Sequence, residues 1–144
     1  MSSRTQQMRR NKGRMMTDSF VRIPHHVINH EIVRTLSCRA TKLFVDLLAQ
    51  YRGYNNGDLC APLSLMKERG WKSSDQLQKA KNELIEKDVI RVTRQGGRNK
   101  CSLYAVTWFQ IDECNGKLDV ASTTTAPVNW KEGLPSPPRG VKGS

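Results

Sequence analysis

The side chains of this chain that are best suited to binding chemistry lie in two short polar segments. Residues 72–82 combine lysine, serine, aspartate, glutamine and asparagine, and residues 91–100 combine arginine, lysine and amide side chains without one acid. Asparagine and glutamine can form paired hydrogen bonds with adenine, lysine can donate to guanine, and arginine binds phosphates. These residue types indicate recognition of a nucleic acid.

The first segment begins a predicted amphipathic helix. Ser73 can cap its N-terminus, Gln76 can reach back to that cap, and the apolar stripe begins at Leu77. At about 100° per residue Lys72, Asp75, Lys79 and Asn82 fall opposite Leu77, with Gln78 at the flank, although any exposed helix face carries similar residues. We expect Ser73 and Ser74 to serve the cap and a phosphate, because the first N–H groups of a helix favour an anion. The candidate DNA-contacting residues of this segment are Lys72, Ser73, Ser74, Asp75, Gln76, Gln78, Lys79 and Asn82.

The second segment is predicted to be a β-hairpin with a basic tip. Val89–Thr93 and Cys101–Val106 are β-rich runs, and the glycine pair at 96–97 permits the reversal between them. Basic residues on such a tip can bind phosphates or enter a narrow minor groove, or they can simply protect a strand edge from aggregation. The candidate residues of this hairpin are Arg91, Arg94, Gln95, Arg98, Asn99 and Lys100.

A third group of basic residues precedes any periodic apolar pattern. Residues 1–19 contain the single acid Asp18, with serine and glutamine between the cations, and we expect a disordered arm. This arm is either a solvated terminus or a segment that lies along phosphates. Its candidate DNA-contacting residues are Arg4, Arg9, Arg10, Lys12 and Arg14.

Several predicted elements would hold these segments in place. Residues 36–51 carry apolar side chains at every third or fourth position, with Ser37 as the candidate N-cap and Gly53 as the predicted stop, and they form the clearest helix. A shorter helix is predicted over residues 25–34, after an extended lead-in at Phe20–Ile23.

The order of the elements indicates the fold. A turn at residues 54–58 and a short strand at Leu59–Ala61 follow the long helix, and a two-turn helix then starts at Pro62 and ends at Gly70. Together with the helix that follows Ser73 and the basic hairpin, this order predicts an α+β winged helix-turn-helix domain, with a three-helix core and a small antiparallel β-hairpin as the wing. We place this domain at residues 20–112.

Composition favours a polyanionic partner. The chain of 144 residues has 24 Lys and Arg against 13 Asp and Glu, a formal net charge of +11, and this surplus raises a positive surface potential. No run of about 18 apolar residues occurs, and no basic-then-apolar signal peptide opens the chain, so we expect no membrane partner. We expect a soluble cytoplasmic protein that associates with the bacterial nucleoid when it is bound to DNA.

The last part of the chain is expected to be a flexible tail. From residue 113 to residue 144 the composition shifts toward threonine, proline, glycine and serine, which does not favour a packed core. Trp130 is the one large apolar aromatic residue there. It is either exposed or docked, on the domain or on a protein partner.

Neither the cysteines nor the histidines predict a metal site. Cys38, Cys60, Cys101 and Cys114 lack the close spacing of zinc ligands, and we expect buried, reduced thiols, with Cys60 and Cys101 on neighbouring strands. We expect exposed or hydrogen-bonded side chains for His25, His26 and His30. No phosphate-cradling glycine loop or Ser/His/Asp order appears, so we expect no enzyme activity, no cofactor and no small-molecule ligand.

Four segments carry a resemblance to a known family. Phe20–Pro24, Leu36-Ser37, Tyr54–Leu59 and Gly70–Ser74 resemble winged helix-turn-helix DNA-binding proteins of phages, plasmids and integrated elements, over about residues 20 to 109. The pattern is similar to the N-terminal DNA-binding domain of phage replication proteins of the O type, which usually carry further domains.

The resemblance implies a function as well as a fold. It implies a double-stranded DNA-binding protein, and the short tail favours a sequence-specific transcriptional regulator of a mobile element or phage. Two alternatives stay open, namely a replication initiator or accessory protein that binds origin repeats, and a winged helix used for protein or RNA contacts. A homodimer and a protein partner bound through the C-terminal tail also stay open.

Overall fold

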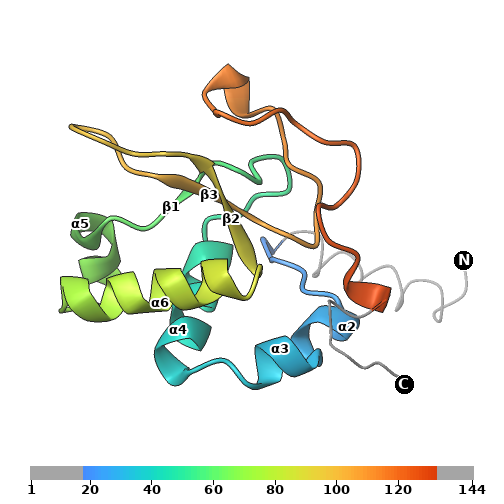
Figure 1. Ribbon diagram of the computed structural model, residues 1–144, viewed down its shortest axis with the longest axis horizontal. Helices are drawn as coiled ribbons and strands as arrows, with labels where there is room; N and C mark the ends of the chain where they lie inside the picture. Colours follow the sequence, from blue (N-terminus) through green and yellow to red (C-terminus); the bar gives the residue numbers. More distant parts are fainter. Residues whose placement is uncertain (1–17, 133–144) are drawn as a thin grey trace, which may run out of the picture.

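The structure is a computed structural model that describes residues 18–132. The five cations of the predicted arm, from Arg4 to Arg14, lie outside the described residues, as do residues 133–144. The fold is α+β, with three main helices and a three-stranded antiparallel sheet of order β1-β3-β2 (Figure 1). The main elements are α4 (Cys38–Leu48), β1 (Leu59–Cys60), α5 (Leu63–Met66), α6 (Ser74–Glu86), β2 (Ile90–Arg94) and β3 (Leu103–Val106).

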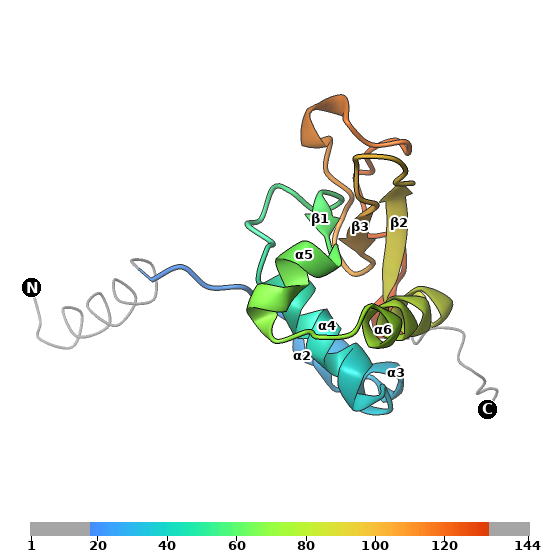
Figure 2. The same cartoon turned by 90° about the vertical axis from the view of Figure 1, so that its left-hand side faces the viewer.

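The helices pack on one another and on the sheet. Helix α6 contacts α4 on one side and β2 on the other, and Figure 2 shows this arrangement in a view nearly along α6. Fully buried leucines from α4 and α6, together with Val89, Ile90 and Val106, form the core between these layers. No helix in the described part of the chain is both long and apolar enough to cross a membrane.

Helix α4 begins where the sequence predicts and ends earlier. The Ser37 hydroxyl accepts a hydrogen bond from the Ala40 N–H at 3.1 Å. The helix ends at Leu48 rather than near Gly53, because Gln50 is bound to the edge of the sheet: its Nε2 donates to the Cys60 carbonyl at 2.7 Å and its Oε1 accepts from the Cys60 N–H at 3.0 Å.

The helix predicted over residues 25–34 is two helices. Helix α2 (His25–Ile28) and helix α3 (Glu31–Arg34) are separated at Asn29 and His30. His30 has an extended backbone, and its Nδ1 accepts a hydrogen bond from the Ile32 N–H at 3.1 Å. A new N-cap inside the predicted helix therefore breaks it.

The segment before α6 follows the sequence-based expectation. Helix α5 continues into the 3₁₀-helix η1 (Lys67–Arg69), which ends at Gly70 with a φ of 97°. The Ser73 hydroxyl then caps α6 by accepting a hydrogen bond from the Gln76 N–H at 3.2 Å. Glycine suits the left-handed position, and serine suits the cap.

The β-hairpin is shorter than predicted. Cys101 and Ser102 lie outside β3, because the Gly96 N–H donates to the Ser102 hydroxyl at 2.9 Å and the chain folds back tightly there. A Cβ atom on Gly96 would stand 2.5 Å from the Ser102 backbone nitrogen, so a larger residue would force the hairpin open.

The prediction of a flexible tail from residue 113 is wrong for its first part. The 3₁₀-helices η2 (Cys114–Gly116) and η3 (Trp130–Glu132) lie in this segment, and Trp130 is 3% exposed. The Trp130 Nε1 donates to the Thr107 hydroxyl at 2.9 Å, and its ring lies edge-on to Trp108 at 5.9 Å between centroids. Packed structure therefore extends through Trp130, because one large aromatic side chain completes the core.

The cysteines differ in burial. Cys38 is exposed, contrary to the expectation of buried thiols, because it occupies the first, outward turn of α4. Cys60, Cys101 and Cys114 are half-buried. Burial and then the neighbouring Cys101 raise the pKa of the Cys60 thiol to about 11, so this thiol stays protonated at neutral pH.

Candidate nucleic-acid interface

The outward face of α6 carries most of the polar side chains that the sequence singles out. Lys72, Ser74, Asp75, Gln78, Lys79 and Asn82 are exposed there, and Ser73 at the cap is half-buried. Along this face the Lys79 Nζ lies 3.2 Å from the Asp75 carboxylate, and the Gln78 Nε2 donates to the Asn82 Oδ1 at 3.0 Å. These pairs are solvent-exposed and weak, so a ligand can replace them at low cost.

One flank of α6 is bound to α4. The Glu83 carboxylate accepts hydrogen bonds from the Ser37 hydroxyl at 2.6 Å and the Ser37 N–H at 2.8 Å. Burial raises the pKa of Glu83, but the bonds from Ser37 outweigh this and leave it below its usual value. Gln76 also lies on this flank, where its Oε1 accepts from Arg39 at 3.1 Å instead of reaching back to the Ser73 cap.

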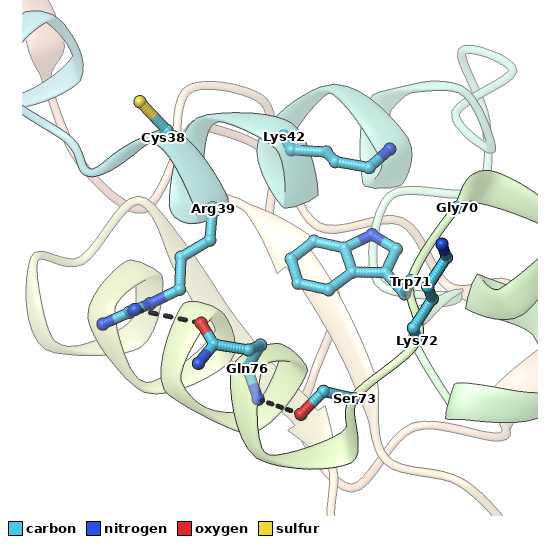
Figure 3. A pocket seen from close by; sticks show the side chains of 8 residues that line it. All are labelled: Cys38, Arg39, Lys42, Gly70, Trp71, Lys72, Ser73 and Gln76. Atoms are coloured by element: carbon cyan, nitrogen blue, oxygen red, sulfur yellow. Dashed lines mark hydrogen bonds between the residues drawn. The ribbon is translucent and has the colours of Figure 1, made fainter.

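A basic hollow of about 380 Å³ opens between α4 and the start of α6. Its cations come from Arg39 and Lys42 of α4 and from Lys72, and none of the described residues that line it is acidic. Figure 3 shows the Trp71 ring between Lys42 and Lys72, while Cys38 points away. Sequence analysis missed Arg39 and Lys42, because nothing near them in the chain indicates that α4 adjoins the start of α6.

A buried acid holds the turn that forms this hollow. Asp46 is 2% exposed and accepts hydrogen bonds from Trp71 Nε1 at 2.7 Å and from Arg69 Nε at 3.0 Å, with Lys42 Nζ at 3.2 Å. The Lys42 Nζ also donates to the Arg69 carbonyl at 2.6 Å. Asp46 therefore fixes the turn before α6 against α4. Its signal in the sequence is an acid within the apolar stripe of a predicted helix.

Replacing Asp46 with alanine is expected to lower the free energy of unfolding by about 1 to 3 kcal/mol, because the buried Trp71 N–H loses its acceptor. The two cations are nearly half exposed and can turn to water. Urea denaturation measures the change. The control is Asp75→Ala, which removes an exposed pair and should shift stability by less than about 0.5 kcal/mol. Equal effects of the two variants would contradict the positioning role of Asp46.

A second hollow, of about 350 Å³, lies between the other flank of α6 and the hairpin. Gln78 and Lys81 line it from α6, and Gln95 and Ser102 line it from the hairpin. Burial lowers the pKa of Lys81. Sequence analysis missed Lys81, because the helical spacing places it close to the buried side of Leu77. An anion that enters the hollow would stabilise the charged form of this amine.

The hairpin tip presents the exposed basic residues Arg98 and Lys100 with Asn99 between them. The structure places the other two predicted arginines elsewhere. Arg91 forms a bidentate ion pair with Asp88, with both distances 2.9 Å, and this hydrogen bonding raises the pKa of Arg91. Arg94 is half-buried and its Nη2 donates to the Cys101 carbonyl at 2.9 Å, which closes the hairpin.

The hairpin tip, α5 and the start of α6 lie at the same end of the molecule, on the left in Figure 1. Within residues 18–132, no group of three or more His, Cys, Asp or Glu side chains could hold a metal ion. Comparison of the chain with protein-family models, curated proteins and solved structures found no match.

Proposed function

We propose that this chain is a double-stranded DNA-binding protein of the winged helix-turn-helix type. Helix α6 is the recognition helix, and the β2–β3 hairpin with its tip is the wing. One observation carries the proposal: the exposed polar face of α6 lies between two hollows, one lined by three cations and the other by Lys81.

The dimensions of B-DNA support this arrangement. The major groove is about 12 Å wide, admits one helix and is bordered on each side by a phosphate backbone. A helix that enters the groove places base-contacting side chains in the middle and phosphate-binding side chains at its flanks. The net charge of +11 adds a favourable long-range term.

We propose further that binding is sequence-specific and that the protein regulates transcription in a mobile element or phage. Lys79 and Asn82 have the donors and acceptors that distinguish base pairs in the major groove. The resemblance of residues 20–109 to DNA-binding proteins of such elements supports this context. Selection of bound duplexes from a random pool tests it, and a palindromic product would indicate a dimer.

Replacing Lys79 or Asn82 with alanine is expected to weaken binding to the selected duplex by about 1 to 3 kcal/mol. Binding to random duplex DNA should stay nearly unchanged. Fluorescence anisotropy on both DNAs measures the two affinities. Lys87→Ala, at the C-terminal end of the same helix, is the matched control. Equal losses on selected and random DNA would show that these side chains do not contact bases.

Replacing Arg98 or Lys100 with alanine is expected to weaken binding to the selected duplex and to random duplex DNA alike. Each lost phosphate contact should reduce the slope of log affinity against log salt by about 0.9. Arg52→Ala, which removes a cation whose Nη1 binds the Ala49 carbonyl, is the control and should leave the slope unchanged. An unchanged slope for Arg98 and Lys100 would remove the wing from the interface.

Competition among nucleic acids tests the proposed partner itself. Duplex DNA should displace a labelled duplex at lower concentration than duplex RNA or single strands, because the A-form major groove is too narrow for a helix. Stronger competition by duplex RNA would favour an RNA-binding role and overturn the proposal.

A further inference from the structure

A buried donor without a partner lies outside the proposed DNA interface. Trp108 follows β3 and is 7% exposed, and its indole Nε1 is fully buried with no hydrogen-bond partner. Leaving an N–H group in this state costs about 1 to 3 kcal/mol, and native proteins keep few such groups. The unpartnered Nε1 points to a ligand whose acceptor would complete it.

A hollow adjoins this indole. It has a volume of about 500 Å³, within the range of small-molecule sites. Trp108, Trp130 and Pro24 give it apolar walls, and the two indoles meet edge-on. A flat apolar group fits walls of this kind.

The described polar side chains that line this hollow, His26, Thr125, Asn129 and Lys131, can all donate a hydrogen bond. Lys131 supplies an ammonium group, and none of the described residues that line the hollow is acidic. The Asn129 Oδ1 accepts from the Lys131 N–H at 3.1 Å, and its Nδ2 group can donate to a ligand. Donors around a cation select an anionic acceptor such as a carboxylate.

A strap of chain forms part of the wall of the hollow. The Thr123 N–H donates to the Ile111 carbonyl at 2.9 Å, and the Val128 N–H donates to the Thr107 carbonyl at 3.1 Å. Between these anchors, in the described chain, no backbone N–H of residues 124–127 is bonded to another element. Thr125 and Ala126 line this hollow and also a second one of about 360 Å³, which Trp108 lines as well.

We propose that the hollow beside Trp108 is a binding site for a small planar carboxylate, such as an aromatic acid. The carboxylate accepts a hydrogen bond from Trp108 Nε1 and is neutralised by Lys131, and the ring of the ligand packs against Trp130. Because Nε1 is covered in this structure, the ligand enters by displacing residues 124–127. The site is independent of the DNA interface, so it stands or falls separately from the proposed function.

The test is an NMR titration of the full chain with 1-naphthoate. The chain has three tryptophans and therefore three indole N–H signals, and the Trp108 signal is assigned as the one lost in Trp108→Phe. This signal should move downfield and saturate. The neutral 1-naphthamide has the same ring and should bind roughly 10-fold more weakly or worse, because hydrogen bonds to charged groups are the stronger ones.

Charge-matched variants separate the site from general attraction of an anion to a basic protein. Lys131→Ala should weaken naphthoate binding by about 3- to 10-fold. Lys67→Ala removes an exposed cation outside the hollow and should leave the affinity for naphthoate unchanged. The proposal is overturned by a static Trp108 signal at millimolar naphthoate, by equal binding of the amide, or by equal effects of the two lysine variants.

Discussion

Replacing Trp130 with alanine is expected to lower the free energy of unfolding by about 3 to 5 kcal/mol, as large-to-small substitutions of buried aromatics do. The ring is 3% exposed and packs against Trp108 and against His30, whose ring centroid lies 5.0 Å away. Truncation leaves a cavity in the core and removes the hydrogen bond that Trp130 donates to Thr107.

Urea denaturation followed by circular dichroism measures this loss. Val120→Ala is the matched control in the same segment, because Val120 is 42% exposed and its truncation should cost less than about 0.5 kcal/mol. Trp130→Phe keeps an aromatic ring without the N–H group and should fall between the two. If Trp130→Ala unfolds at the same urea concentration as Val120→Ala, the segment up to Trp130 is not part of the cooperative fold.

The second large effect is expected at Asn56, whose single buried side chain forms hydrogen bonds with several backbone groups. Its Nδ2 lies 2.8 Å from the Gln110 carbonyl, 3.0 Å from the Val106 carbonyl and 3.2 Å from the Phe109 carbonyl. Its Oδ1 accepts a hydrogen bond from the Val106 N–H at 2.8 Å. Asn56 thereby joins the turn after α4 to the end of β3.

Asn56→Ala should therefore lower the free energy of unfolding by about 3 kcal/mol or more. The substitution leaves several buried backbone groups without a hydrogen-bond partner, at about 1 to 3 kcal/mol each. Asn56→Asp keeps the shape but turns a carboxylate toward three carbonyl oxygens. Its folded-state pKa is then raised above the unfolded value, so this variant should gain stability as pH falls below its folded pKa.

Urea denaturation at pH 7 and at pH 4 tests both variants. The exposed Asn82→Ala serves as the control and should be near wild type in stability. The stability of Asn56→Asp is compared with that of wild type at each pH. If the variant loses no more stability at pH 7 than at pH 4, the arrangement of acceptors around Asn56 is contradicted.

Much of the fold follows from interactions between neighbours in the chain. The Ser37 and Ser73 caps, the left-handed Gly70 and the apolar stripes of α4 and α6 each involve residues within one or two helical turns. Propensity and periodicity report such short-range interactions directly, and the outward face of α6 follows from the same periodicity. The two helix predictions that fail, at His30 and at Gln50, do so where a side chain forms a cap or a hydrogen bond to the sheet edge in place of the helix.

Only the folded chain decides the contacts that shape the candidate sites. Asp46 meets Arg69 across 23 residues, Trp130 meets Thr107 across 23, and Asn56 meets Val106 across 50. Such pairs leave no periodic signal, because their energy depends on burial and on geometry that loops set. For the same reason the sequence assigns Arg91 and Arg94 to a binding surface, whereas in the structure Asp88 and the Cys101 carbonyl bind their guanidinium groups. Residue type determines what a side chain can bind, but tertiary packing decides which partner is within reach.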